Sequence, residues 1–120
     1  MKISEIVRIT GLTASTIRFY EKIGLIREIA KDEHNQRIFS DDDKRWIKFL
    51  ASIKNARLSI NEMMAYAELY YSKNESIPDR LAVTEQCKEK LISEINELQE
   101  GIRFLDSKIK FYKDLIDQNK

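Results

Sequence analysis

The segment TASTIRFYEKIGLI, residues 13–26, carries the most information about the fold of this chain. Thr13 belongs to the residue types that cap helix N-termini, and Gly24 to those that follow helix C-termini. Ile17 and Tyr20 are three residues apart, so they would share one apolar face of a helix. The segment therefore predicts a short amphipathic helix.

A second short helix is predicted immediately before this segment. Ser4 can cap a helix that contains Ile6 and Ile9 and ends near Gly11. Two short helices joined by a turn that holds a glycine are typical of a helix-turn-helix.

Residues 25–39 have a different pattern. Apolar residues stand at both ends of this stretch and flank the polar segment KDEHNQ, residues 31–36. Asn35 in that segment is a residue type that adopts left-handed backbone conformations in tight turns. The pattern predicts a β-hairpin, which would form a wing beside the helix-turn-helix.

Two further helices are predicted after the hairpin. Ser40 is a good N-cap, and the carboxylates of residues 41–43 would lie at the positive end of the helix dipole. The helical pattern restarts at Leu58 and Ser59. The expected inward positions of the first helix are Trp46, Phe49, Leu50 and Ile53, and the second helix would contain Ile60, Met63, Met64, Ala67 and Leu69.

The C-terminal third of the chain has an apolar stripe with alternating gaps of four and three residues. This spacing is the heptad pattern of a coiled coil, and a stripe this narrow needs a partner helix to cover it. We therefore expect a homodimer, although the spacing alone leaves the helix direction open. The expected dimerisation residues, called the heptad stripe below, are Leu91, Ile95, Leu98, Ile102, Leu105, Ile109, Tyr112 and Ile116.

These patterns predict a mostly α-helical chain with three parts. Residues 1–70 would form a winged helix-turn-helix domain, residues 71–80 a linker, and residues 81–120 a long dimerisation helix. A second apolar strip on that helix is expected to contact the partner's first domain. Its members are Phe104, Phe111 and Leu115.

Composition excludes several classes of protein and site. One cysteine, Cys87, and one histidine, His34, exclude an intrachain disulfide and a zinc site built from several such ligands. No apolar run is long enough for a membrane span and no secretory leader is evident, so we expect a cytoplasmic protein without a membrane partner. No nucleophile–base pair or phosphate-binding glycine loop is visible, so we expect neither catalysis nor a cofactor.

The chain resembles the MerR family of bacterial transcription regulators. The resemblance rests on MKISEIVRITGLTASTIRFYEKIGLI (residues 1–26), on an arginine in the hairpin, and on FSDDDKRWIKFLASIKNARLSINEM (residues 39–63). It implies an antiparallel coiled-coil dimer that binds double-stranded promoter DNA between the two promoter elements. It further implies that the dimer bends and untwists this DNA, and so acts on RNA polymerase indirectly.

The sequence departs from the usual family pattern at three places. The hairpin tip has Asn35-Gln36-Arg37 instead of Asn-Gly-Tyr-Arg. Arg57 stands where a glycine is frequent, and it would carry modest strain if that position needs a positive φ. Ser52 replaces a cysteine of the electrophile- and aldehyde-responsive branch, which the chain otherwise resembles most.

Residues expected to contact DNA come from the second helix, the hairpin and the start of the third helix. Arginine can form paired hydrogen bonds with phosphate or guanine, and lysine supplies a point charge. We expect Phe19 to pack into the core instead. The candidate DNA-binding residues are Ser15, Thr16, Arg18, Tyr20, Lys22, Arg37, Lys44 and Arg45.

Two other functions remain open from the sequence. The chain could be a plain repressor or architectural DNA binder, or a coiled-coil module that binds protein instead of DNA. Because the chain ends with the predicted coiled coil, we expect no separate effector domain, and the sequence names no small-molecule effector.

Overall fold

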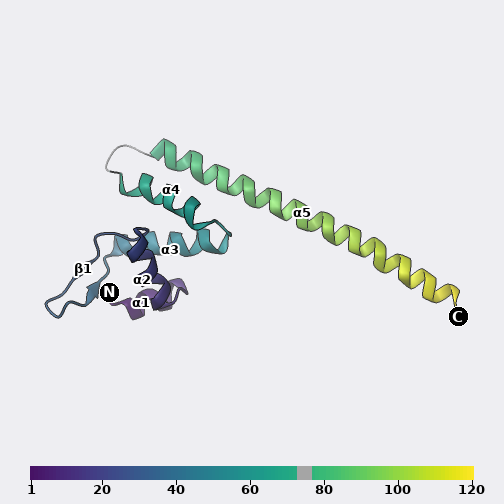
Figure 1. Cartoon of the computed structure of the whole chain (residues 1–120), viewed down its shortest axis with the longest axis horizontal. Helices are drawn as coiled ribbons and strands as arrows, with labels where there is room; N and C mark the ends of the chain where they lie inside the picture. Colours follow the sequence, from purple (N-terminus) through teal and green to yellow (C-terminus); the bar gives the residue numbers. More distant parts are fainter. Residues whose placement is uncertain (73–76) are drawn as a thin grey trace. The chain divides into compact units, whose positions relative to one another are not determined.

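The computed structural model describes residues 1–72 and 77–120. The order of elements is α1 (Ile3–Thr10), α2 (Ala14–Ile23), β1 (Ala30–Lys31), β2 (Arg37–Ile38), α3 (Asp41–Asn55), α4 (Ile60–Tyr71) and α5 (Ile77–Gln118), as Figure 1 shows. The predicted fold class is therefore confirmed: a helix-turn-helix with a two-stranded wing, followed by a long helix. The chain divides into two compact units, Met1–Leu81 and Ala82–Lys120.

Local capping sets the ends of α2 and α3. The Thr13 side chain accepts a hydrogen bond from the Thr16 amide, and Gly24 ends α2 with a φ of 89°. Ser40 and Asp43 form a reciprocal capping box at the start of α3. These caps are the ones that the sequence predicts.

The start of α1 differs from the prediction. Lys2 is the N-cap residue, without a side-chain cap, and the helix begins at Ile3, so Ser4 is not the cap. Backbone hydrogen bonds join Met1 to Phe39 in both directions, at 2.7 and 2.8 Å, and hold the chain immediately before the helix. Met1 is thereby fixed to the end of the hairpin, and α1 begins before Ser4.

The hairpin is short and its tip is internally bonded. Strands β1 and β2 are antiparallel, with Lys31 opposite Arg37. Asn35 has a φ of 60°, as the turn chemistry predicts. The Asp32 carboxylate accepts hydrogen bonds from the backbone amides of His34 and Gln36, which closes the tip. In Figure 1 the hairpin projects from the group of helices α1, α2 and α3.

The core of the first unit lies between α1, α2, α3 and α4. Trp46 of α3 is buried and donates a hydrogen bond from its indole nitrogen to the Leu25 carbonyl oxygen at 2.8 Å. Phe19 is not part of this core: 48% of its surface is exposed, contrary to the prediction. The largest fully buried side chains are Phe39, Ile6, Ile17, Leu25, Ile26, Ile47, Leu50 and Met63.

Helix α5 has 42 residues and begins at Ile77, whereas the sequence placed its start near Leu81. Pro78 is compatible with this start, because the first turn of a helix needs no intrahelical amide donors. Of the expected linker 71–80, residues 73–76 lie outside the described residues. None of the heptad-stripe side chains is buried in the single chain. No helix of the described part is long and apolar enough to cross a membrane.

Candidate nucleic-acid interface

Helix α2 divides into a buried face and an exposed face. Ile17 and Tyr20 are buried, and burial raises the pKa of the Tyr20 hydroxyl. Ser15, Arg18 and Lys22 are exposed. Their spacing of three, four and seven residues puts them on one side of the helix. Neither Arg18 nor Lys22 forms an ion pair with any described residue, so both charges remain available to an anionic partner.

Two candidate contact residues of α2 are less accessible. Tyr20 exposes only 3% of its surface, so its main role in this structure is packing. Thr16 is half-exposed, and its hydroxyl accepts a hydrogen bond from the Thr13 hydroxyl at 2.9 Å. Ser15 lies exposed in the first turn of α2. The positive end of the helix dipole there favours anions.

An ion pair connects the hairpin to α2. The Nε atom of Arg37 lies 2.5 Å from a carboxylate oxygen of Glu21, and both side chains are partly buried. The bond uses one of the five donor hydrogens of the guanidinium group. Arg37 is thus held at α2, which the sequence did not predict because the two residues are 16 positions apart.

Lys44 and Arg45 lie at the beginning of α3, among the carboxylates of residues 41–43. Arg45 forms an ion pair with Asp42 within the same helix. In the described part of the chain, no hydrogen bond or ion pair joins Lys44 or Arg45 to α2 or to the hairpin. The structure therefore groups Ser15, Arg18 and Lys22 on one face of α2.

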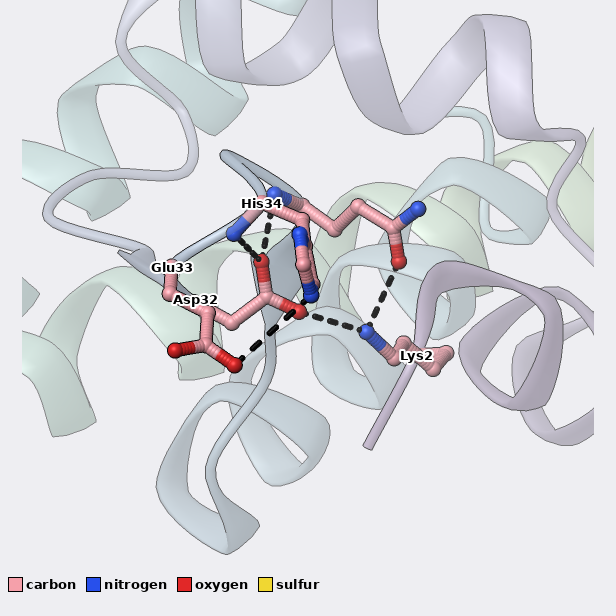
Figure 2. A network of polar contacts seen from close by, with 5 residues as sticks. Lys2, Asp32, Glu33 and His34 are labelled. Carbon is pink, nitrogen blue, oxygen red and sulfur yellow. Dashed lines mark hydrogen bonds and ion pairs between the residues drawn. The ribbon is translucent and has the colours of Figure 1, made fainter.

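Lys2 is a structural residue that the sequence analysis missed. Its ammonium group lies 2.9 Å from both the Asp32 carboxylate and the Gln36 side-chain oxygen. Figure 2 shows Lys2 and Asp32 in the polar network at the hairpin tip. The hydrogen bond from Lys2 is the largest cause of the lowered pKa of Asp32. No periodic or local signal marks this contact, because it spans 30 residues.

A family comparison identifies the fold and its class of function. Residues 1–68 match the model of the MerR HTH family regulatory protein, a range that contains both helices of the helix-turn-helix, the hairpin and α3. The chain belongs to the MerR family. Every candidate DNA-contacting residue lies inside the matched range.

Two relatives with similar sequences are HTH-type transcriptional regulators. An HTH-type transcriptional regulator of Haemophilus influenzae is 32% identical over 103 residues, which cover 86% of this chain and 76% of that protein. The HTH-type transcriptional regulator AdhR of Bacillus subtilis is 32% identical over 92 residues, which cover 77% of this chain and 66% of AdhR.

Solved MerR structures agree with the fold over most of the chain. A MerR family protein from Listeria monocytogenes has a TM-score of 0.82 and 34% identity, with 94% of this chain and 86% of that chain covered. HiNmlR is described as a MerR family regulator lacking the sensor domain, bound to promoter DNA. It has a TM-score of 0.78 and 29% identity, and the match covers 94% of this chain and 90% of HiNmlR.

One hollow in the first unit is lined by four aromatic and three charged side chains: Trp46, Phe49, Tyr66, Tyr70, Asp42, Arg45 and Arg80. Its volume is about 350 Å³, and the rings of Trp46 and Tyr70 stack beside it with centroids 3.9 Å apart. Trp46 belongs to α3 and Tyr70 to α4, so the stacked rings hold these two helices together, while the indole hydrogen bond to Leu25 fixes Trp46 in place. No group of three or more potential metal ligands occurs within residues 1–72 and 77–120.

Proposed function

We propose that this MerR family transcriptional regulator binds promoter DNA sequence-specifically as a homodimer. The observation that carries the proposal is the exposed face of α2, where Arg18 and Lys22 have no anionic partner among the described residues. A helix of a helix-turn-helix that presents unpaired cations suits the major groove, where arginine and lysine contact phosphates and guanine edges. HiNmlR, which is bound to promoter DNA, shares this fold.

The hairpin is proposed to add a second contact beside that groove. The ion pair with Glu21 sets the position of Arg37 relative to α2, so both elements would approach DNA as one surface. Lys44 and Arg45 are proposed to contribute phosphate contacts from the start of α3. Arg45 would have to exchange its pairing with Asp42 for such a contact.

Dimerisation is proposed to occur through α5. The heptad stripe is uncovered in the single chain, and a long helix with a narrow apolar stripe is marginally stable alone in water. Residues 1–70 would then serve DNA binding and residues 81–120 dimerisation. We propose the antiparallel arrangement because the family resemblance implies it. Phe104, Phe111 and Leu115 would contact the partner's first domain.

A dimer with two equal DNA-binding domains requires a pseudo-palindromic operator. We propose that the dimer bends and untwists promoter DNA, so that RNA polymerase is affected through the DNA and needs no contact with the protein. Such a mechanism derives part of its specificity from the energy of deforming the DNA.

An electrophoretic mobility shift experiment tests DNA binding. The chain is titrated into a duplex selected from random sequences, at several salt concentrations. Arg18→Ala should weaken binding by roughly 1–3 kcal/mol, which is about 5-fold to 150-fold, and should reduce the salt slope by about one phosphate contact. Arg103→Ala on α5 removes the same charge away from the proposed interface and should leave affinity unchanged.

The same experiment separates the alternative functions. If the wild-type chain binds no duplex at low salt, the chain is not a DNA binder. The alternative function, a coiled-coil module that binds protein, is then favoured. If it binds DNA without changing the DNA's bend or twist in a circular-permutation or topology assay, the protein is a plain repressor.

A further inference from the structure

The exposed face of α2 contains an aromatic ring as well as cations. Phe19 exposes 48% of its surface, and it is the only aromatic residue among the exposed large hydrophobics of residues 1–72. It follows Ser15 by four residues and precedes Lys22 by three, so it shares their side of the helix. The ring therefore belongs to the surface that is proposed to meet DNA.

The ring also has a defined support. Its centroid lies 6.3 Å from that of Tyr20, which is buried in the core, and the two rings are tilted by 47°. One side of Phe19 thus lies near a fixed neighbour while the other faces solvent. Contact with an apolar group would remove that remaining surface from water, which is favourable.

The chemistry of the major groove restricts which group this can be. Base edges there present hydrogen-bond donors and acceptors, which a phenyl ring cannot pair with, and one apolar group, the C5-methyl of thymine. Phosphates would be taken by Arg18 and Lys22, the charged neighbours on the same face. A phenyl ring flanked by two cations is therefore suited to a thymine methyl between contacted phosphates.

We infer that Phe19 is a specificity-determining residue that contacts the C5-methyl group of one thymine in each operator half-site. The inference rests on the proposed function, because it places α2 in the major groove. Phe19 would recognise a base through an apolar contact, in addition to the polar contacts proposed for Arg18 and Lys22.

Replacement of thymine by deoxyuridine tests the inference directly. Deoxyuridine pairs like thymine and lacks only the methyl group. Every thymine of the selected operator is replaced singly, and affinity is measured by competition at constant salt. For the wild-type chain, replacement of the thymine at one position per half-site should lower operator affinity about fourfold. This factor corresponds to burial of one methyl-sized group. All other positions should be unaffected.

The variants assign that effect to Phe19. Phe19→Ala should bind the thymine and the deoxyuridine operators equally, and selection with this variant should no longer require thymine at that position. Phe19→Leu, which keeps an apolar side chain, should retain part of the discrimination. Ile60→Ala removes a similarly exposed apolar side chain from α4 and should discriminate as the wild type does. Circular dichroism confirms that each variant is folded.

Two results would overturn the inference while leaving the proposed function intact. One is a wild-type chain that binds its operator but is insensitive to every deoxyuridine substitution. The other is a Phe19→Ala variant with the same deoxyuridine effect as the wild type. A wild-type chain that binds no duplex would instead overturn the proposed function, and the role of Phe19 together with it.

Discussion

Arg57 adopts a left-handed backbone conformation, with a φ of 65°, between α3 and α4. The amide of Arg57 donates to the Lys54 carbonyl oxygen, so the tight turn itself satisfies the end of α3. A side chain with a β-carbon is strained in this conformation, whereas glycine is not. Arg57 is thus a residue whose backbone conformation and residue type disagree.

Arg57→Gly should therefore stabilise the chain. The relief of strain exceeds the additional entropy of glycine in the unfolded state, and we expect a gain of about 0.5–1 kcal/mol. Urea denaturation measures the change. Arg57→Ala removes the same side chain but keeps the β-carbon, so it should give no gain, and an equal gain in both variants would contradict the strain argument.

Glu21 and Arg37 form a partly buried ion pair between α2 and the hairpin. Because both side chains are largely shielded from water, the pair is less screened than a surface ion pair. Glu21→Gln should cost about 1 kcal/mol of folding stability in urea denaturation. It should also change DNA affinity, because it frees Arg37. Glu5→Gln, at an exposed acid of α1, should change stability by at most a few tenths of a kcal/mol.

Helices α3 and α4 begin where local chemistry provides caps. Capping boxes start both α3 and α4, formed by Ser40 with Asp43 and by Ser59 with Glu62. Both helices carry core residues of the first unit. Loss of one cap thus weakens the packing of a whole element as well as its first turn.

Ser40→Ala should destabilise the first unit by about 1 kcal/mol, the usual effect of removing a serine N-cap. Thermal unfolding followed by circular dichroism measures the change. Ser52→Ala provides a control inside the same helix, where the exposed hydroxyl bonds only to the Lys48 carbonyl oxygen of the preceding turn. That variant should be neutral or slightly stabilising. Equal losses in both variants would contradict the assignment of Ser40 as the cap.

In the whole molecule, the heptad stripe is proposed to link dimerisation to DNA binding. None of its side chains is buried in the single chain, and the gaps between them alternate between four and three residues, as a coiled coil requires. Two DNA-binding domains at a defined separation need a rigid connection, which α5 would supply only when paired. Loss of dimerisation should thus weaken operator binding even though the DNA-contacting residues are unchanged.

Ile102→Asp places a charge in the middle of the stripe and should shift the protein towards monomer at micromolar concentration. Sedimentation velocity measures the association, and mobility shift on the same samples measures DNA affinity, which should fall in parallel. Arg103→Asp introduces the same residue at the neighbouring position, outside the stripe, and should remain dimeric. An Ile102→Asp variant that sediments as a dimer would show that the stripe is assigned in the wrong register.

Features that depend on neighbours along the chain follow from the amino-acid sequence alone. Thr13, Gly24 and Ser40 end or begin helices through hydrogen bonds and backbone angles within four residues. The same holds for the left-handed turn at Asn35 and for the spacing of the heptad stripe. Local chemistry is sufficient there because each interaction is completed inside one turn or one element.

Tertiary packing sets which faces the helices bury and which distant residues come into contact. Phe19 was expected in the core, but the neighbouring helices cover Ile17 and Tyr20 and leave Phe19 exposed. Lys2 meets Asp32 and Arg37 meets Glu21 only because the hairpin folds back onto α1 and α2. These contacts join residues 16 to 30 positions apart, and no local pattern encodes them, since they exist only after the helices have packed.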